Sequence, residues 1–183
     1  FAVRKGPVRV YAADNWRRPR FEVGPTDQLV SSIAVSLDNQ MIALTRRGNL
    51  VQLLDSHDGH LVGTITLEHD EPSVVEFCQD GVTLAIGTTT GRILFYNLRS
   101  RQVRTNSKGH AGPINALALV PDSHIVVSAG RDKQLNLWDL ESGDLVTQLR
   151  GHLRQVFTIA ASADGQTLVS GGLQGDIRVW QGD

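Results

Sequence analysis

Cysteine is almost absent from this sequence of 183 residues, which contains one cysteine and one methionine. Cys78 has no partner for an intrachain disulfide, so the fold must depend on a packed core rather than on covalent cross-links. A single thiol is typical of a reducing compartment, and we therefore expect a cytoplasmic location. We expect Cys78 itself to be a small apolar filler at the point where a strand meets a turn.

Long apolar runs are also missing, which excludes a membrane-spanning segment, and we expect no membrane contact. The start, FAVRKGPVRVY, lacks the hydrophobic block of a signal peptide and an initiator methionine, so we expect a processed or truncated start. Charge of one sign is lacking as well, because 18 Lys and Arg stand against 19 Asp and Glu. No global field therefore draws the chain to nucleic acid.

The sequence is rich in repeats. GHAGPINALALVPDSHIVVSAGRDKQLNLWD begins at Gly109, and GHLRQVFTIAASADGQTLVSGGLQGDIRVW, from Gly151, matches it nearly element for element. Trp138 and Trp180 are 42 residues apart, and steps of 42 or 43 residues lead back to aligned bulky residues at Tyr96, Leu53 and Tyr11. A shared period over five positions indicates a repeat architecture.

Each repeat contains short β-strands. INALALV, HIVVSA, QLNLWDL and DLVTQLR are rich in aliphatic and β-branched residues, and the turn clusters PDS, GRDK and ESGD separate them. No segment has sustained 3.6-residue periodicity. The sequence therefore predicts an all-β protein with four strands in each repeat.

Four strands within a GH…WD frame resemble the WD40-repeat β-propeller family. The amino-acid sequences of the last two repeats are similar to those of bacterial members. The resemblance covers essentially the whole chain and implies about four repeats plus part of a fifth, arranged as an incomplete arc of four-stranded antiparallel blades. It divides the chain into the third and fourth strands of a preceding blade (1–23), two degenerate blades (24–67 and 68–106), a well-formed blade (107–149) and a final blade lacking its fourth strand (150–183).

The resemblance also implies a buried hydrogen-bond chain in each well-formed blade. The repeat from Gly109 supplies the full set: His110, Ser128, Asp132 and Trp138. The last repeat keeps His152, Ser170 and Trp180. It has Gln174 at the Asp place, so we expect a shorter or water-completed network there. In the two degenerate repeats the Ser and Asp places are occupied by Ile86 and Thr90, and by Ala43 and Arg47.

A hydrolase triad of His110, Ser128 and Asp132 is the catalytic alternative. The sequence has no G-x-S-x-G elbow, no Walker A loop and no H-E-x-x-H helix. We therefore predict a non-catalytic protein without a cofactor. We also predict no metal site, because His57 and His60 in SHDGH match no standard zinc spacing and are typical of a solvated turn.

The predicted function is a protein-interaction scaffold, or a recruitment or sensing domain, within a larger propeller or assembly. Unpaired edges at both ends of the arc predict ring completion by a longer chain, by a second polypeptide or by a second copy, giving a homo- or hetero-oligomer. Two alternatives stay open: a regulatory domain of a bacterial multidomain signalling enzyme, and a nucleic-acid-associated propeller.

In the family, partners commonly contact two top-face positions of each repeat, early in the first strand and just before the turn Asp. The resemblance places the first position at Val75, Asn115 and Phe157. It places the second at Arg46, Thr89, Arg131 and Leu173. Exposed Phe157 and Leu173 would act as anchors, unless they pack inward, and Arg46 and Arg131 would pair with acidic partner groups.

Basic residues gather in the first twenty positions, at Arg4, Lys5, Arg9, Arg17, Arg18 and Arg20. Tyr11 and Trp16 lie among them, which favours phosphate contacts with base stacking. The competing interpretation is a solvated edge whose long charged side chains discourage aggregation. Because the chain is nearly neutral, nucleic acid is the less favoured partner.

Overall fold

The protein is described here by a computed structural model, which covers residues 7–24, 29–105 and 109–181. The candidate residues Arg4 and Lys5 lie outside the described residues. Within the described part the chain forms strands and a single turn of 3-10 helix. None of the described residues belongs to a helix with the length and hydropathy of a membrane span.

The strands form five antiparallel groups, which follow one another along the chain. A hairpin comes first, with strands β1 (Val8–Val10) and β2 (Phe21–Val23). The first sheet contains β3 (Val30–Val35), β4 (Met41–Arg46), β5 (Leu50–Asp55) and β6 (Leu61–Thr66). The second sheet contains β7 (Pro72–Phe77), β8 (Thr83–Thr88), β9 (Ile93–Asn97) and β10 (Val103–Thr105).

The third sheet contains β11 (Ile114–Leu119), β12 (Ile125–Gly130), β13 (Gln134–Asp139) and β14 (Leu145–Arg150). The last sheet contains three described strands: β15 (Val156–Ala161), β16 (Thr167–Gly172) and β17 (Ile177–Gln181). The 3-10 turn, η1 (Leu173–Gly175), joins β16 to β17. Segment boundaries near residues 24 and 106 adjoin positions outside the described ranges, so these boundaries remain predictions.

Hairpin turns between first and second strands depend on one aspartate in three of the four described sheets, and on Ser123 in the third sheet. The Oδ1 atoms of Asp38, Asp80 and Asp164 accept hydrogen bonds from the backbone N–H two residues on, at 3.0, 3.0 and 3.1 Å. Such side-chain bonds mimic a backbone turn and reverse the chain within a few residues. The sequence clusters that contain these aspartates therefore separate strands, as the repeat pattern predicts.

Second strands are the most deeply buried, because each complete sheet packs against neighbours on both faces. All six residues of β8 are buried, and so are the last five of β12. The sequences of these strands therefore contain continuous runs of buried residues rather than alternating apolar and polar residues. Cys78 is fully buried beside these strands, and burial raises the pKa of its thiol to about 12, so it remains a neutral apolar filler.

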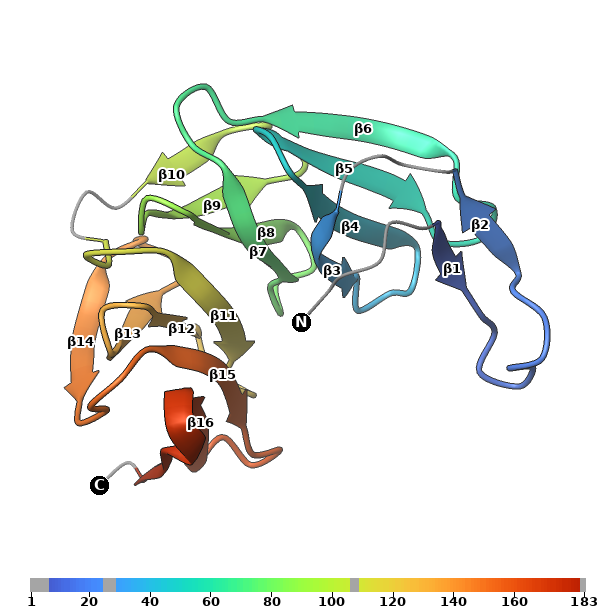
Figure 1. Ribbon diagram of the computed structural model, residues 1–183. Coiled ribbons are helices and arrows are strands. Elements are labelled where there is room, and N and C mark those ends of the chain that lie inside the picture. The colour runs from blue at the N-terminus through green and yellow to red at the C-terminus, as the bar shows by residue number, and fades with distance from the viewer. Residues whose placement is uncertain (1–6, 25–28, 106–108, 182–183) are drawn as a thin grey trace.

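The sheets lie side by side around an open arc, and the two ends of the arc do not meet (Figure 1). Separate apolar cores fill the junctions between neighbouring sheets. A smaller core joins the β1–β2 hairpin to Ile42, Leu44 and Leu54 of the first sheet. The expected all-β fold, an incomplete propeller arc of antiparallel four-stranded sheets, is confirmed.

Strand pairing corrects the repeat register in the first half of the chain. Leu54 pairs with Ile42 in the way that Tyr96 pairs with Leu84 and Trp138 with Val126. The period is therefore 42 from Leu54 to Trp180, and Leu54 rather than Leu53 is the equivalent of Tyr96. The sequence alignment chose wrongly because both positions are leucine. Their side chains point to opposite faces, Leu53 toward the second sheet and Leu54 toward the hairpin.

Candidate functional site

The third sheet contains a complete buried polar chain. The Nδ1 atom of His110 lies 2.8 Å from Oδ1 of Asp132, and its Nε2 atom lies 2.7 Å from Oγ of Ser128. The indole N–H of Trp138 donates to the same Oγ at 2.8 Å. Because a carboxylate only accepts hydrogen bonds, Nδ1 is the donor to Asp132, which leaves Nε2 to accept from the serine hydroxyl.

This chain is structural, and the geometry does not support the hydrolase alternative. Ser128 and Trp138 are both 0% exposed, and His110 is 5% exposed. The serine hydroxyl is already engaged by the imidazole and the indole, so it has no access to a substrate. The four side chains instead tie the loop before β11 to the second and third strands of the same sheet, where each buried polar group is satisfied.

The last sheet repeats this arrangement with one correction to the sequence analysis. Oγ of Ser170 lies 2.6 Å from Nε2 of His152 and accepts from Trp180 at 2.8 Å. The carboxylate comes from Asp176, whose Oδ2 lies 2.7 Å from Nδ1 of His152. The expectation of a shortened network at Gln174 is wrong, because Asp176, two residues further along a turn of the same length that contains η1, supplies the carboxylate.

The second sheet replaces the histidine chain by a different polar cluster. Asp70 is 9% exposed, accepts a hydrogen bond from the hydroxyl of Thr90, and forms an ion pair with Arg92 at 2.9 Å. Thr88, fully buried, bonds to the backbone of Arg92. Thr90 therefore does not replace the aspartate of the family pattern as an acceptor. It donates to a carboxylate that the repeat alignment did not single out.

Arg46 is a buried residue rather than a top-face contact. It is 8% exposed, and burial lowers the pKa of its guanidinium. Its structural equivalents are Gly130 and Gly172, where an added Cβ would lie 2.6 and 3.0 Å from Nδ1 of the His110 and His152 rings. The side chain of Arg46 therefore points toward the space that histidine fills in the later repeats.

Backbone hydrogen bonds identify the turn residues that are equivalent in the four repeats, and their role as top-face partner contacts remains a prediction. In each repeat, one residue after the second strand donates its N–H to the carbonyl of a residue just before the first strand, two positions ahead of the β-bulge that begins that strand. These four donors are Arg47, Thr89, Arg131 and Leu173. All four are exposed. The assignment of this position to Arg46 is one residue out of register, for the same reason as that of Leu53.

Strand pairing also corrects the predicted partner-contact position early in the first strand of each repeat. A β-bulge begins each first strand, and it places Ser31, Ser73, Asn115 and Phe157 at equivalent sites. Val75 is 1% exposed in the core between the first and second sheets, so it is a packing residue without a surface for a partner. Phe157 and Leu173 are each 44% exposed, which excludes full inward packing. Their role as anchors remains a prediction.

Two of the bulge residues link neighbouring sheets. Ser73 donates through its hydroxyl to the carbonyl of Ile114 at 2.6 Å, and the Asn115 amide donates to the carbonyl of Val156 at 2.6 Å. Both acceptors are the first residues of the next sheet. Asn115 is therefore committed to holding two sheets together, in addition to any contact it makes with a partner.

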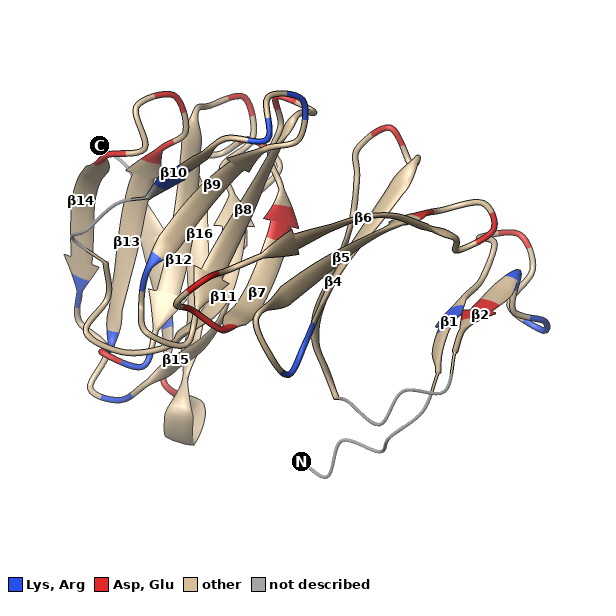
Figure 2. Cartoon of the chain, turned by 90° about the horizontal axis from the view of Figure 1, so that it is seen from above, with Lys and Arg blue, Asp and Glu red and all other residues tan. Residues whose placement is uncertain are grey.

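The β1–β2 hairpin carries the described part of the basic cluster at one end of the arc (Figure 2). Arg9 pairs with Glu22 at 2.8 Å, so part of its charge is already compensated. Arg17, Arg18 and Arg20 are exposed, and Trp16 is 72% exposed beside them. The cluster faces solvent. Both interpretations of the sequence, phosphate contacts with base stacking and a charged edge that discourages aggregation, require this.

The SHDGH turn between β5 and β6 brings three possible metal-ligand atoms together. The side chains of Asp55, Asp58 and His60 offer these atoms within 4.8 Å of one another. Asp58 and His60 already bond each other at 2.7 Å, and this hydrogen bond raises the pKa of His60. His57 contacts Asp55 at 3.5 Å. These exposed groups satisfy one another as solvated turn residues do.

Acid is expected to weaken the third sheet through Asp132. Burial disfavours its charge, but hydrogen bonds from His110, Ala111 and Gln134 outweigh burial and hold its pKa below the ordinary value. The contribution of Asp132 to the free energy of unfolding is therefore complete above the unfolded-state pKa of about 3.9. It disappears as the pH falls through the lower pKa of the folded state. Urea unfolding between neutral pH and acid should show stability falling below about pH 4.

The matched variants for this measurement are Asp132→Asn and Asp122→Asn. Asp132→Asn should lower stability at neutral pH and flatten the acid slope, because the charged acceptor is gone. Asp122 is exposed in a turn and makes none of these bonds, so its variant should follow the parent protein. An unchanged acid slope in Asp132→Asn would contradict the assignment.

Comparison with known proteins supports this fold. A family model described as "Nucleolar protein 10-like, N-terminal domain" matches residues 18–176. The chain is 29% identical over 112 residues to "WD repeat-containing protein SL1-17" of Schistosoma mansoni, covering 61% of the chain and 37% of that protein. It is 31% identical over 93 residues to "Periodic tryptophan protein 2" of Saccharomyces cerevisiae, covering 50% and 10%.

A solved structure shares the architecture. "Structure of U3-55K" superposes with a TM-score of 0.78 at 21% identity, covering 85% of this chain and 50% of that one. This likeness shows the fold. The chain spans 37% or less of the length of the two curated relatives, so the activities of the whole relatives are not transferred to it. Both relatives are eukaryotic, and the similarity to bacterial members remains a prediction.

Proposed function

Because the chain belongs to the WD40 β-propeller family of nucleolar protein 10-like N-terminal domains, we propose that it is a non-catalytic protein-interaction scaffold whose open arc is completed by further protein. The observation that carries this proposal is an apolar face on the last sheet. Ile177 is 71% exposed, Val179 62% and Val169 39%. A run of aliphatic side chains open to water on one sheet face is typical of an interface.

The earlier sheets bury this same face. The residues equivalent to Val169 and Ile177 are Val127 and Leu135 in the third sheet, both 0% exposed. In the second sheet they are Ala85 and Ile93, also 0% exposed. Each of these faces is covered by the sheet that follows. The last sheet therefore has a surface built to receive another sheet, which no described residue covers.

The opposite end of the arc is open in a complementary way. Ile33 and Val35 of β3 are 48% and 51% exposed, whereas their equivalents Val75 and Phe77 in β7 are 1% and 3% exposed. The β1–β2 hairpin packs against Ile42, Leu44 and Leu54 of β4 and β5 but leaves Ile33 and Val35 of β3 exposed. Burial contributes about 25 cal/mol for each Å² of apolar surface removed from water, so both faces favour association.

The chemistry of both faces favours protein as the partner. Their exposed side chains are aliphatic, which suits packing against another sheet and offers nothing to a phosphate backbone. For location, the family description names a nucleolar protein, and this supports a nucleolar site rather than the cytoplasmic one expected from the sequence. Localisation of a fluorescent fusion of the intact protein tests that part of the proposal.

The scaffold proposal predicts that the 20.0 kDa chain associates through its open faces. Light scattering after gel filtration, at several concentrations, should give a mass above that of a monomer. The double variant Ile177→Glu/Val179→Glu should be monomeric, because two charges on the face cannot be buried without a large desolvation cost. Its cooperative thermal unfolding should be retained, since both side chains are exposed in the single chain.

The matched control is Val146→Glu/Leu153→Glu, which adds the same charge at residues that are 57% and 75% exposed, on β14 and in the loop before β15. It should behave as the parent chain does. A parent chain that is monomeric at every concentration and unfolds cooperatively would overturn the proposal, because the open faces would then be stable in water.

A further inference from the structure

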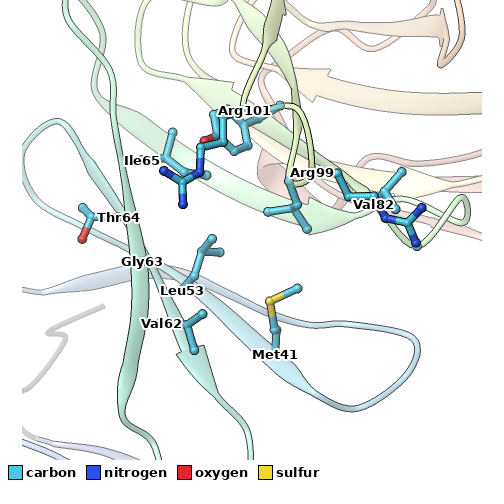
Figure 3. Close-up of a pocket in the computed structure, with 12 residues that line it drawn as sticks. Met41, Leu53, Val62, Gly63, Thr64, Ile65, Val82, Arg99 and Arg101 are labelled. Atoms are coloured by element: carbon cyan, nitrogen blue, oxygen red, sulfur yellow. The ribbon is translucent and has the colours of Figure 1, made fainter.

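A second possible binding surface lies on the outer side of the arc, away from both open faces. It is a groove of about 390 Å³ between the first and second sheets. Figure 3 shows Val62, Gly63 and Thr64 on β6 at one side, Arg99 and Arg101 on the loop after β9 at the other, and Leu53 between them. Grooves of this size are large enough for part of a ligand or peptide.

The floor of the groove is apolar, with one aromatic residue, Tyr96, among the described residues that line it. Leu53 and Ile65 belong to the core between the two sheets, and Met41 and Leu98 pack against that core. Val62, at the mouth, is 53% exposed. An apolar side chain that enters the groove would therefore continue an existing hydrophobic core.

Gly63 leaves the groove open. A Cβ added at this position would meet nothing within 4 Å, and the backbone is extended rather than left-handed. The groove is lined by four consecutive residues of β6, from Val62 to Ile65. Because neighbouring strand residues point to opposite faces, this lining includes the backbone edge of the strand. β6 is the outermost strand of its sheet, so that edge is available for strand pairing.

The rim of the groove carries an uncompensated positive charge. Arg99 and Arg101 are exposed, and neither forms an ion pair with any described residue. No carboxylate lies among the residues that line the groove. A ligand with acidic groups on either side of an apolar group would complement both features.

Arg101 occupies a backbone conformation that favours glycine. Its φ is +57°, and its N–H bonds to the carbonyl four residues back, as do those of Gly59 (φ +78°) and Gly143 (φ +77°) in the equivalent turns. A left-handed conformation costs a side-chain-bearing residue roughly 1 kcal/mol. Two repeats avoid this cost with glycine, whereas this repeat retains an arginine at the rim. Retained strain of this kind is a marker of function.

The arginine pair distinguishes this groove, because the equivalent positions between the third and last sheets also line a hollow, of about 530 Å³, but include no charged residue. At the junction between the second and third sheets, the residues equivalent to Arg99 and Arg101 are Glu141 and Gly143. The place of Gly63 is taken by Arg104, whose Cβ would lie 3.8 Å from a Cβ at Gly143. Side chains close that junction, and no arginine pair borders it.

We propose that this groove binds an extended acidic segment of a partner protein. One apolar side chain enters above Leu53, flanking carboxylates pair with Arg99 and Arg101, and the segment lies along the free edge of β6. The proposal rests on the scaffold function, but it uses a surface separate from the open faces. A protein segment fits better than nucleic acid, because Tyr96 is the one aromatic side chain among the described residues that line the groove, and successive bases need several aromatic platforms.

Fluorescence anisotropy with the intact protein tests the proposal. The probe is a short fluorescein-labelled peptide with a central leucine flanked by glutamates, and the reference peptide has lysines in their place. We expect micromolar binding of the acidic peptide, weakened by salt, and no binding of the lysine peptide. Single-stranded RNA should not compete. Equal binding of both peptides, or displacement by RNA, would overturn the proposal.

Three variants locate the binding. Arg99→Glu/Arg101→Glu should weaken it at least about tenfold, because charge-assisted bonds become repulsions. Gly63→Phe should abolish it by filling the groove. Arg101→Gly should weaken it while raising the thermal unfolding midpoint, since the strained turn is relieved. A merely structural arginine would give a higher midpoint with unchanged binding, and that result would contradict the proposal.

The charge-matched control is Arg150→Glu/Arg154→Glu, at exposed residues outside the groove. It should bind the acidic peptide as the parent does, and loss of binding there would point to a non-specific charge effect that overturns the proposal. Ile177→Glu/Val179→Glu separates this proposal from the scaffold proposal. This variant should lose assembly and keep peptide binding, so each proposal can fail without the other.

Discussion

Replacing Ser128 by alanine is expected to lower the free energy of unfolding by about 2–5 kcal/mol. The hydroxyl is the centre of the polar chain in the third sheet, where it bonds to Nε2 of His110 and accepts from the indole of Trp138. The variant leaves Nε2 of His110 and the indole N–H of Trp138 without a hydrogen bond in a region that water does not reach. Each unsatisfied buried group costs about 1–3 kcal/mol.

The matched variant for this prediction is Ser170→Ala in the last sheet. Its Oγ makes the same two bonds, but Trp180 is only half-buried, so water can replace part of what is lost. Urea unfolding followed by tryptophan fluorescence should show a smaller loss for Ser170→Ala than for Ser128→Ala. Equal losses would mean that burial does not control the cost, and a neutral Ser128→Ala would show that the chain adds little to stability.

Gly109→Ala is expected to destabilise the protein by about 3 kcal/mol, near the upper end of what overpacking usually costs. A Cβ at this position would lie 2.1 Å from the carbonyl oxygen of Gly91 in the preceding sheet. The obstacle is backbone, which cannot rotate away as a side chain can. The same carbonyl accepts a hydrogen bond from the N–H of His110 at 2.7 Å. Any shift that relieves the clash therefore also moves the histidine of the polar chain.

Two other glycines serve as controls for steric pressure. A Cβ at Gly151, the equivalent position of the last repeat, would meet the side-chain Nη1 of Arg178 at 3.0 Å, and that side chain can move. A Cβ at Gly112 would meet nothing closer than 3.7 Å. Thermal unfolding should rank the alanine variants in the order Gly109, Gly151, Gly112, from most to least damaging. Similar effects at all three positions would contradict a steric origin.

This prediction also explains why glycine precedes histidine at the start of a well-formed repeat. The loop that delivers His110 passes directly over the backbone of the second sheet, and only a residue without a side chain fits there. The Gly-His pair therefore fixes the position of one sheet relative to the next. The Trp-Asp pair at the other end of the frame completes the same polar chain through Trp138.

The sequence by itself determined the all-β class and the 42-residue period, and its resemblance to the WD40 family implied the members of the polar chain in the third sheet. These features are local or periodic: turn aspartates and short apolar runs specify strands within a few residues. Repetition then transfers the assignment from one blade to the next. The absence of catalytic motifs also separated a structural role for Ser128 from a nucleophilic one, and the burial of its hydroxyl supports that distinction.

Tertiary structure alone decided the features that depend on register and on contacts between sheets. Pairing distinguished Leu54 from Leu53 and Arg47 from Arg46, since a shift of one residue reverses the face of every side chain. Turn geometry brought Asp176 to His152, and packing buried Val75. The exposed faces at the ends of the arc and the groove beside Arg101 arise where neighbouring sheets meet or are lacking. Such non-local contacts leave no periodic trace in a single sequence.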